Sequence, residues 1–114
     1  MENCIFCKII DGTIPSKKVY EDETMVAIED IDPKAPLHLL LLPKSHFCNC
    51  FDMTAQDEQT VGHLLRMAGK LAAEHGFSET GFRLVQNNGA SAGQTVFHLH
   101  IHLLAGRDLQ WSPG

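Results

Sequence analysis

Residues 97–104 read FHLHIHLL, a run in which histidines alternate with apolar residues. Alternation with a period of two is typical of a β-strand that buries one face. We therefore predict a strand over residues 96–104 that presents three imidazoles on one face, from His98, His100 and His102. The apolar residues between them should pack against a helix on the other face: Phe97, Leu99, Ile101 and Leu103.

The remaining sequence predicts four more strands, one long helix and a short N-terminal helix. Apolar residues recur with helical spacing from about Thr54 to His75, and Thr54 is a good N-cap. A helical turn is expected in CIFCKIIDG, and the other strands over residues 18–22, 24–30, 37–44 and 81–86. Strands in succession with short connections favour an α+β fold with a five-stranded antiparallel sheet, in a single domain spanning residues 1–114.

Composition and charge exclude several classes of protein. The net charge is −5 and no lysine or arginine cluster is present, which argues against nucleic acid as a partner. No apolar run is long enough to cross a membrane, and MENCIFCKII does not have the pattern of an export signal. We therefore expect a cytoplasmic protein, in which the four cysteines are thiols or metal ligands.

Three alternating histidines can either bind a metal or supply a nucleophile with supporting acid–base groups. The segment NNGASAGQT, residues 87–95, runs directly into the histidine strand. Its glycines allow backbone N–H groups to approach an anion closely, and Asn87, Gln94 and Thr95 add neutral hydrogen-bonding side chains. This combination suits a phosphate beside a histidine.

The pair Cys4-x-x-Cys7 is a separate signal with three readings. The cysteines are incidental thiols, two ligands of a zinc ion completed by histidines, or a redox pair without the strand that usually precedes one. Cys48 and Cys50 have poor ligand spacing, and we expect them to be ordinary thiols.

The segment HLHIHLL resembles the His-φ-His-φ-His-φ-φ signature, with φ apolar, of the histidine triad family of nucleotide hydrolases and transferases. The resemblance runs from about residue 4 to residue 114. It points to the Hint branch of nucleotide-binding proteins, and LAGR at residues 104–107 stands where the fragile histidine triad branch has a proline–arginine pair. The other segments that carry it are IFCKIIDGTIPSKKVYEDE, DIDPKAPLHLLLLPKSH, GFRLVQNNG, GQTVFHLHIHLLAGR and WSPG.

This resemblance implies a homodimer whose sheets join, and hydrolysis of the phosphorus–nitrogen bond of purine nucleoside 5′-phosphoramidates, such as those of adenosine, through a nucleotidyl-histidine. His100 would be the nucleophile, with His102 and His38 around it and His98 on the phosphate or leaving-group side. Asp30 would hold the ribose hydroxyls. The resemblance places Asn87, Gly93, Gln94 and Thr95 around the phosphate, Phe6, Ile9, Ile28 and Ile31 in the base pocket, and Trp111 towards the partner's site.

Related branches with a cysteine pair bind structural zinc, adding a histidine after a Pro-Lys pair and the first triad histidine. The matching residues here are Cys4, Cys7, His46 and His98, so the resemblance implies a structural zinc at these four positions. Such a site would withdraw His98 from the phosphate. The path that the resemblance implies for His100 would require no metal.

Two alternatives to a phosphoramidate hydrolase remain open from the sequence. The first is a dinucleoside polyphosphate hydrolase or nucleotidyltransferase, which would use the same histidine and differ in how the pocket fits the second half of the substrate. The second is a nucleotide-binding regulatory module. The intact triad, with His100 in the middle position, favours retained chemistry.

Overall fold

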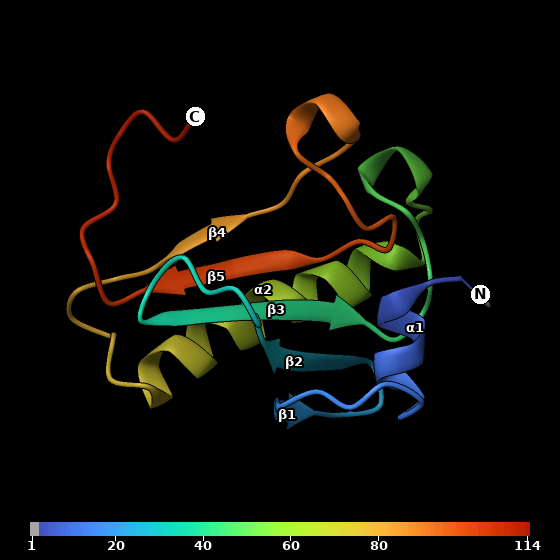
Figure 1. Ribbon diagram of the computed structural model, residues 1–114, viewed down its shortest axis with the longest axis horizontal. Helices are drawn as coiled ribbons and strands as arrows, with labels where there is room; N and C mark the ends of the chain where they lie inside the picture. Colours follow the sequence, from blue (N-terminus) through green and yellow to red (C-terminus); the bar gives the residue numbers. More distant parts are fainter. Residues whose placement is uncertain (1–2) are drawn as a thin grey trace.

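A computed structural model describes residues 3–114 and contains one five-stranded antiparallel sheet with strand order β1-β2-β3-β5-β4 (Figure 1). The predicted α+β architecture is confirmed. The strands are β1 (Lys18–Glu21), β2 (Met25–Glu29), β3 (Leu37–Pro43), β4 (Arg83–Val85) and β5 (Ile101–Ala105). The helices are α1 (Ile5–Ile10) and α2 (Asp57–Glu74), with short 3-10 turns η1 (Cys50–Asp52) and η2 (Ala90–Ala92).

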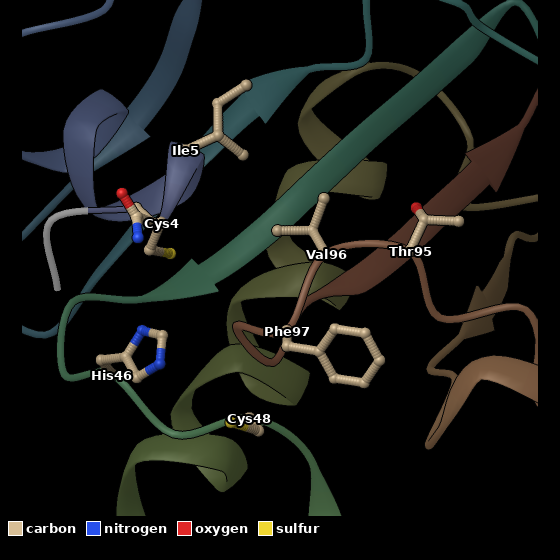
Figure 2. Close-up of a pocket in the computed structure, with 8 residues that line it drawn as sticks. Cys4, Ile5, His46, Cys48, Thr95, Val96 and Phe97 are labelled. Atoms are coloured by element: carbon tan, nitrogen blue, oxygen red, sulfur yellow. The ribbon is translucent and has the colours of Figure 1, made fainter.

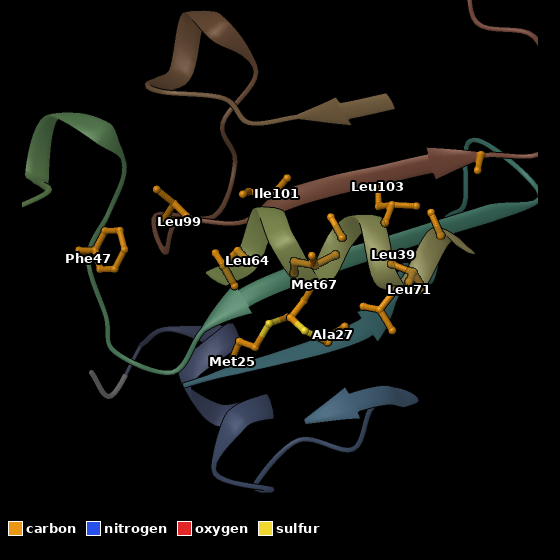
Figure 3. Packing of buried hydrophobic residues seen from close by; sticks show 14 residues of the cluster. Met25, Ala27, Leu39, Phe47, Leu64, Met67, Leu71, Leu99, Ile101 and Leu103 are labelled. Atoms are coloured by element: carbon orange, nitrogen blue, oxygen red, sulfur yellow. The ribbon is translucent and has the colours of Figure 1, made fainter. Parts of the chain in front are cut away.

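The two helices cover opposite faces of the sheet. Because side chains alternate along a strand, successive residues of β3 face different helices. Leu39 and Leu41 of β3 belong to the core that contains the buried residues of α2, and Figure 3 shows this packing. Leu40 and Leu42 belong to a second apolar cluster beneath α1. β3 is therefore apolar on both faces, which explains its continuous leucine run. Neither helix in the described residues has the length and apolar character that crossing a membrane requires.

The fifth strand is shorter than predicted. β5 begins at Ile101, so His98, which lies in a bend, and His100 both precede it and are not part of the ladder. The opposite strand, β3, ends at Pro43, which has no N–H to donate, and the Leu99 N–H bonds instead to the Phe47 carbonyl at 2.8 Å.

The apolar residues of this segment follow the prediction with one exception. Leu99, Ile101 and Leu103 pack in the core with α2. Phe97 was expected beside them, but this prediction is wrong, because its side chain is 46% exposed. Phe97 lies before the strand begins, where the alternation of a pleated strand no longer sets its direction.

The long helix also begins later than predicted. α2 starts at Asp57, and Gln56 is its N-cap without a side-chain hydrogen bond. Thr54 does not cap the helix, because its N–H and hydroxyl both donate to the Asp57 carboxylate, at 2.8 and 3.1 Å. Its carbonyl accepts the Asp57 N–H, so residues 54–56 form a separate turn.

Asp22 organises the turn between β1 and β2 and links it to α2. Its carboxylate accepts hydrogen bonds from the Tyr20 hydroxyl at 2.7 Å, the His63 ring at 2.7 Å, and the backbone N–H groups of Thr24 and Met25. Partial burial opposes ionisation of Asp22. The bonds from His63, Tyr20 and the turn outweigh this effect and hold the carboxyl pKa well below its usual range.

Replacing Asp22 with asparagine should lower the free energy of unfolding at pH 7 by roughly 1–3 kcal/mol, the usual effect of losing hydrogen bonds to a charged group. A carboxyl with a lowered native pKa stabilises the fold above its ordinary pKa of about 4, and this stabilisation is lost as the pH falls towards the native value. The deficit of the variant should therefore shrink below pH 4. Urea unfolding between pH 7 and pH 2.5 measures it, with the neighbouring exposed Glu23→Gln as the control. A deficit that stays constant over this range would show that the charge contributes nothing.

Candidate active site and metal centre

The candidate catalytic histidines lie on the face of the sheet that carries α1. Leu40 of β3 pairs with His102 of β5, and both belong to the α1 face. His38 is the diagonal neighbour of His102 across the two strands, a position from which long side chains meet. Their facing ring nitrogens are 2.9 Å apart. Phe6 of α1 packs its ring edge-on against His100, with centroids 5.0 Å apart.

His100 is held as a neutral imidazole with one nitrogen free. Its Nδ1 lies 2.8 Å from the His98 carbonyl, and a carbonyl only accepts, so Nδ1 carries the hydrogen. Nε2 then has a lone pair. Burial lowers the pKa of His100, which keeps the ring uncharged at neutral pH. A neutral imidazole with a free Nε2 can act as a nucleophile or a base.

The backbone also sets the tautomer of His38. The Lys34 N–H donates to His38 Nδ1 at 3.0 Å, so the ring hydrogen of His38 is on Nε2. That atom faces His102 Nδ1 at 2.9 Å and the Asp30 carboxylate at 3.3 Å. Burial lowers the pKa of His38, and it lowers the pKa of His102 to about 4. His102 therefore accepts at Nδ1 and has a hydrogen to donate at Nε2.

Gln94 holds the glycine-rich loop in place. It is buried, and its amide oxygen accepts from the Asn49 side chain and the Gly89 N–H, at 3.0 and 2.8 Å. Its amide nitrogen donates to the Cys48 and Val96 carbonyls. Gly89 and Gly93, at the two ends of η2, have φ of +93° and +99°, where a residue with a side chain would be strained.

The other residues expected to bind nucleotide fall into two groups. Phe6, Ile9 and Ile28 are buried in the apolar cluster beneath α1, whereas Ile31 is fully exposed in the loop after β2. Near the glycine-rich loop, Thr95 is exposed and Asn87 is half-buried, with its amide 3.6 Å from where a Gly93 side chain would begin.

A second cluster brings together Cys4, Cys7, His46 and His98, whose ligand atoms all lie within 4.8 Å of one another. His46 Nδ1 lies 3.1 Å from His98 Nδ1 and 3.4 Å from the Cys7 sulfur. His98 Nε2 donates to the Pro43 carbonyl at 2.8 Å, which leaves Nδ1 free to ligate. Two thiols and two imidazoles are the donor set of a tetrahedral zinc site, so these residues fit a structural metal.

The ring of His98 therefore faces the cysteines, and its carbonyl is the group that contacts the His100 ring. Cys4, His46, Thr95 and Phe97 are among the residues that line a hollow of about 670 Å³. In Figure 2, Thr95 lies across from Cys4 and His46. Burial, the largest effect, lowers the pKa of His98 to about 4, so its ring is neutral, as a ligand must be.

Sequence reasoning missed three partners of this site. The Lys34 N–H and the Pro43 carbonyl set the tautomers of His38 and His98. Because every residue has main-chain groups, no pattern of residue types signals them. Asn49, whose side chain donates to Gln94, lies between Cys48 and Cys50 and belongs to no recognisable sequence motif.

The fold and its buried neutral imidazoles define a site suited to nucleophilic or acid–base chemistry by histidine. The chain belongs to the HIT family, because the HIT domain model matches residues 11–109. The resemblance to the histidine triad family is confirmed.

Several characterised and uncharacterised proteins are similar over nearly the whole chain. The purine nucleoside phosphoramidase of Escherichia coli K12 is 43% identical over 108 residues, covering 95% of this chain and 91% of that protein. An uncharacterised HIT-like protein of Synechococcus elongatus is 48% identical over 113 residues, covering 99% and 98%. The crystal structure of a HIT family hydrolase from Legionella pneumophila matches with a TM-score of 0.96 and 46% identity, covering 98% of this chain and all of that one. These similarities support a hydrolase.

Proposed function

We propose that this protein hydrolyses purine nucleoside 5′-phosphoramidates, adenosine 5′-phosphoramidate among them, through a nucleotidyl intermediate on His100. The observation that carries the proposal is the bond from His100 Nδ1 to the His98 carbonyl, which leaves Nε2 free for attack. The similarity to the Escherichia coli purine nucleoside phosphoramidase supports this choice of substrate.

In the first step, the lone pair of His100 Nε2 would form a bond to phosphorus while the phosphorus–nitrogen bond of the substrate breaks. The departing nitrogen takes the electron pair and needs a proton, which His102 Nε2 or the Thr95 hydroxyl would supply. In the second step, water would attack phosphorus while the bond from phosphorus to His100 Nε2 breaks and its electron pair returns to Nε2. The group that gave up its proton in the first step would take a proton from the water, and the nucleoside monophosphate would be released. N–H groups of the glycine-rich loop would stabilise the phosphoryl oxygens.

The remaining site residues would bind the nucleotide. The Asp30 carboxylate would accept hydrogen bonds from the ribose hydroxyls, and Asn87 and Thr95 would contact the phosphate. Gln94 already uses its amide inside the protein, so its contribution would be to hold the loop that includes Gly93. The base would lie against Phe6, Ile9, Ile28 and Ile31, of which the first three are buried in one apolar cluster.

We also propose that Cys4, Cys7, His46 and His98 bind a structural zinc ion. A bound zinc would supply a cross-link between α1 and the chain before β5, with all four ligand positions taken by protein. His98 would then connect the metal site to the nucleophile, since its ring ligates and its carbonyl orients His100. Thiols that must stay reduced favour a cytoplasmic location.

A homodimer is part of the same proposal. β1 and β4 are the edge strands of the sheet, and an edge strand with unpaired backbone groups can pair with a second copy. Trp111, which is 87% exposed in the C-terminal segment, would then reach the partner's site. The proposal requires neither nucleic acid nor a membrane as a partner.

The deciding experiment is a turnover assay with adenosine 5′-phosphoramidate and, in parallel, a diadenosine polyphosphate. We expect adenosine monophosphate and ammonia from the first substrate at a much higher kcat/KM than cleavage of the second. Cleavage of the polyphosphate alone would identify the polyphosphate branch instead. If neither substrate is cleaved but calorimetry detects purine monophosphate binding, the protein is a binding module.

A further inference from the structure

We propose that Gly106 and Arg107, the two residues that follow β5, form a clamp that positions His38 and, through it, His102 for the reaction. The inference rests on the proposed function for its catalytic meaning. The contacts that define the clamp are independent of any substrate.

The clamp holds the loop between β2 and β3. Leu37 pairs with Ala105, so the residues after β5 emerge directly beside this loop (Figure 1). Arg107 Nε donates to the Lys34 carbonyl at 2.8 Å across 73 residues of sequence.

Gly106 makes the second contact of the clamp. It has φ of +99°, and a Cβ at this position would lie 2.8 Å from Pro36 Cβ and 3.3 Å from the ring of Phe77. Only glycine therefore allows the chain after β5 to approach the loop between β2 and β3 this closely.

Lys34 transmits the clamp to the histidines through its backbone. Its carbonyl is held by Arg107, and its N–H donates to His38 Nδ1 at 3.0 Å. This N–H keeps the hydrogen of His38 on Nε2, where it faces His102 Nδ1 at 2.9 Å. His102 is then left with its hydrogen on Nε2, one of the two groups proposed to protonate the leaving nitrogen. If the loop shifts, Nδ1 of His38 loses its hydrogen-bond donor. The tautomer of His38, and with it that of His102, is then no longer fixed.

The side chain of Arg107 holds the Lys34 carbonyl without contributing to the core. Arg107 is exposed, and its other hydrogen bond is to the Asp108 carbonyl beside it. Replacing it should change the stability of the fold little, as surface substitutions usually do. Arg83 provides a matched control, since its side chain also donates to a carbonyl of the C-terminal segment, that of Leu109 at 3.4 Å, rather than to a carbonyl of the loop between β2 and β3.

The test compares wild type with Arg107→Ala, Gly106→Ala and Arg83→Ala. Turnover of adenosine 5′-phosphoramidate gives kcat and KM, and long-range ¹H–¹⁵N NMR of the imidazoles gives the tautomers of His38 and His102. We expect Arg107→Ala and Gly106→Ala to lower kcat on the order of 10–100-fold with a smaller effect on KM, since a small misplacement of a catalytic group has such effects. Both should also produce a mixture of His38 tautomers. Arg83→Ala should match wild type in both readouts.

Two results would overturn the clamp. One is an Arg107→Ala variant with the kcat and His38 tautomer of wild type. The other is a folded Arg107→Ala variant that loses activity with the His38 tautomer unchanged, because the effect would then not pass through His38. If wild type does not cleave the phosphoramidate, the proposed function fails, and the tautomer comparison still supports or overturns the clamp.

Discussion

Replacing His100 with alanine is expected to reduce turnover by several orders of magnitude, because no other imidazole can take its place as nucleophile. His38 and His102 are bonded to each other through their facing nitrogens, and the ring of His98 faces the cysteines. Measured with saturating adenosine 5′-phosphoramidate, the loss should appear in kcat. The dissociation constant of adenosine monophosphate should stay within a few-fold of wild type, as calorimetry would report.

His75→Ala is the matched control for this variant. His75 is exposed at the end of α2, and its ring donates to the Leu71 carbonyl, far along the chain from the triad. It should leave turnover unchanged. Intact-protein mass spectrometry during turnover should find a nucleotidylated species in wild type and none in His100→Ala. Equal turnover by His100→Ala and wild type would remove His100 from its role.

Removing the proposed zinc ion is expected to destabilise the protein strongly. A ligand present at about 1,000 times its dissociation constant stabilises the native state by about 4 kcal/mol. For a domain of this size, that corresponds to a fall in Tm on the order of 10–20 °C. We expect this fall for wild type treated with a chelator and for Cys7→Ser without one. Cys48→Ser, which removes a thiol outside the cluster, should leave Tm nearly unchanged.

Metal content is the second measurement. Protein purified with reduced thiols and without added metal should contain close to one zinc per chain by elemental analysis. Wild type and Cys48→Ser should retain it, and Cys7→Ser should lose it. Wild type that contains no zinc although its thiols are reduced, and whose Tm does not rise when zinc is added, would contradict the proposed site.

Much of the fold was accessible from local patterns. The leucine run before Pro43, the helical spacing before His75 and the alternation of residues 101–105 each reflect burial that repeats along one element. The ends of elements were less accessible. The start of α2 depends on the side chain of Asp57 bonding to Thr54, and the start of β5 depends on where β3 ends, which lies far away in the sequence.

The chemistry of the site divides in the same way. Residue types alone identify the imidazoles and thiols, because a neutral imidazole can act as a nucleophile near neutral pH and a thiolate is a soft metal ligand. Their protonation is a property of the tertiary structure. The carbonyls of His98 and Pro43 and the N–H of Lys34 select which nitrogen of each ring carries the hydrogen, and burial keeps the rings neutral.

The amino-acid sequence alone therefore sufficed to identify the sheet and the run of histidines, because side-chain chemistry and hydrophobic spacing are written in residue types. His98 and His100 nevertheless lie before β5, and only the resemblance to the histidine triad family connected Cys4 and Cys7 with His46 and His98. The position of Arg107 against Lys34 and the roles of His98 became visible only in the folded chain. Hydrogen bonds to main-chain groups are available at every residue, and long-range packing alone selects which of them form.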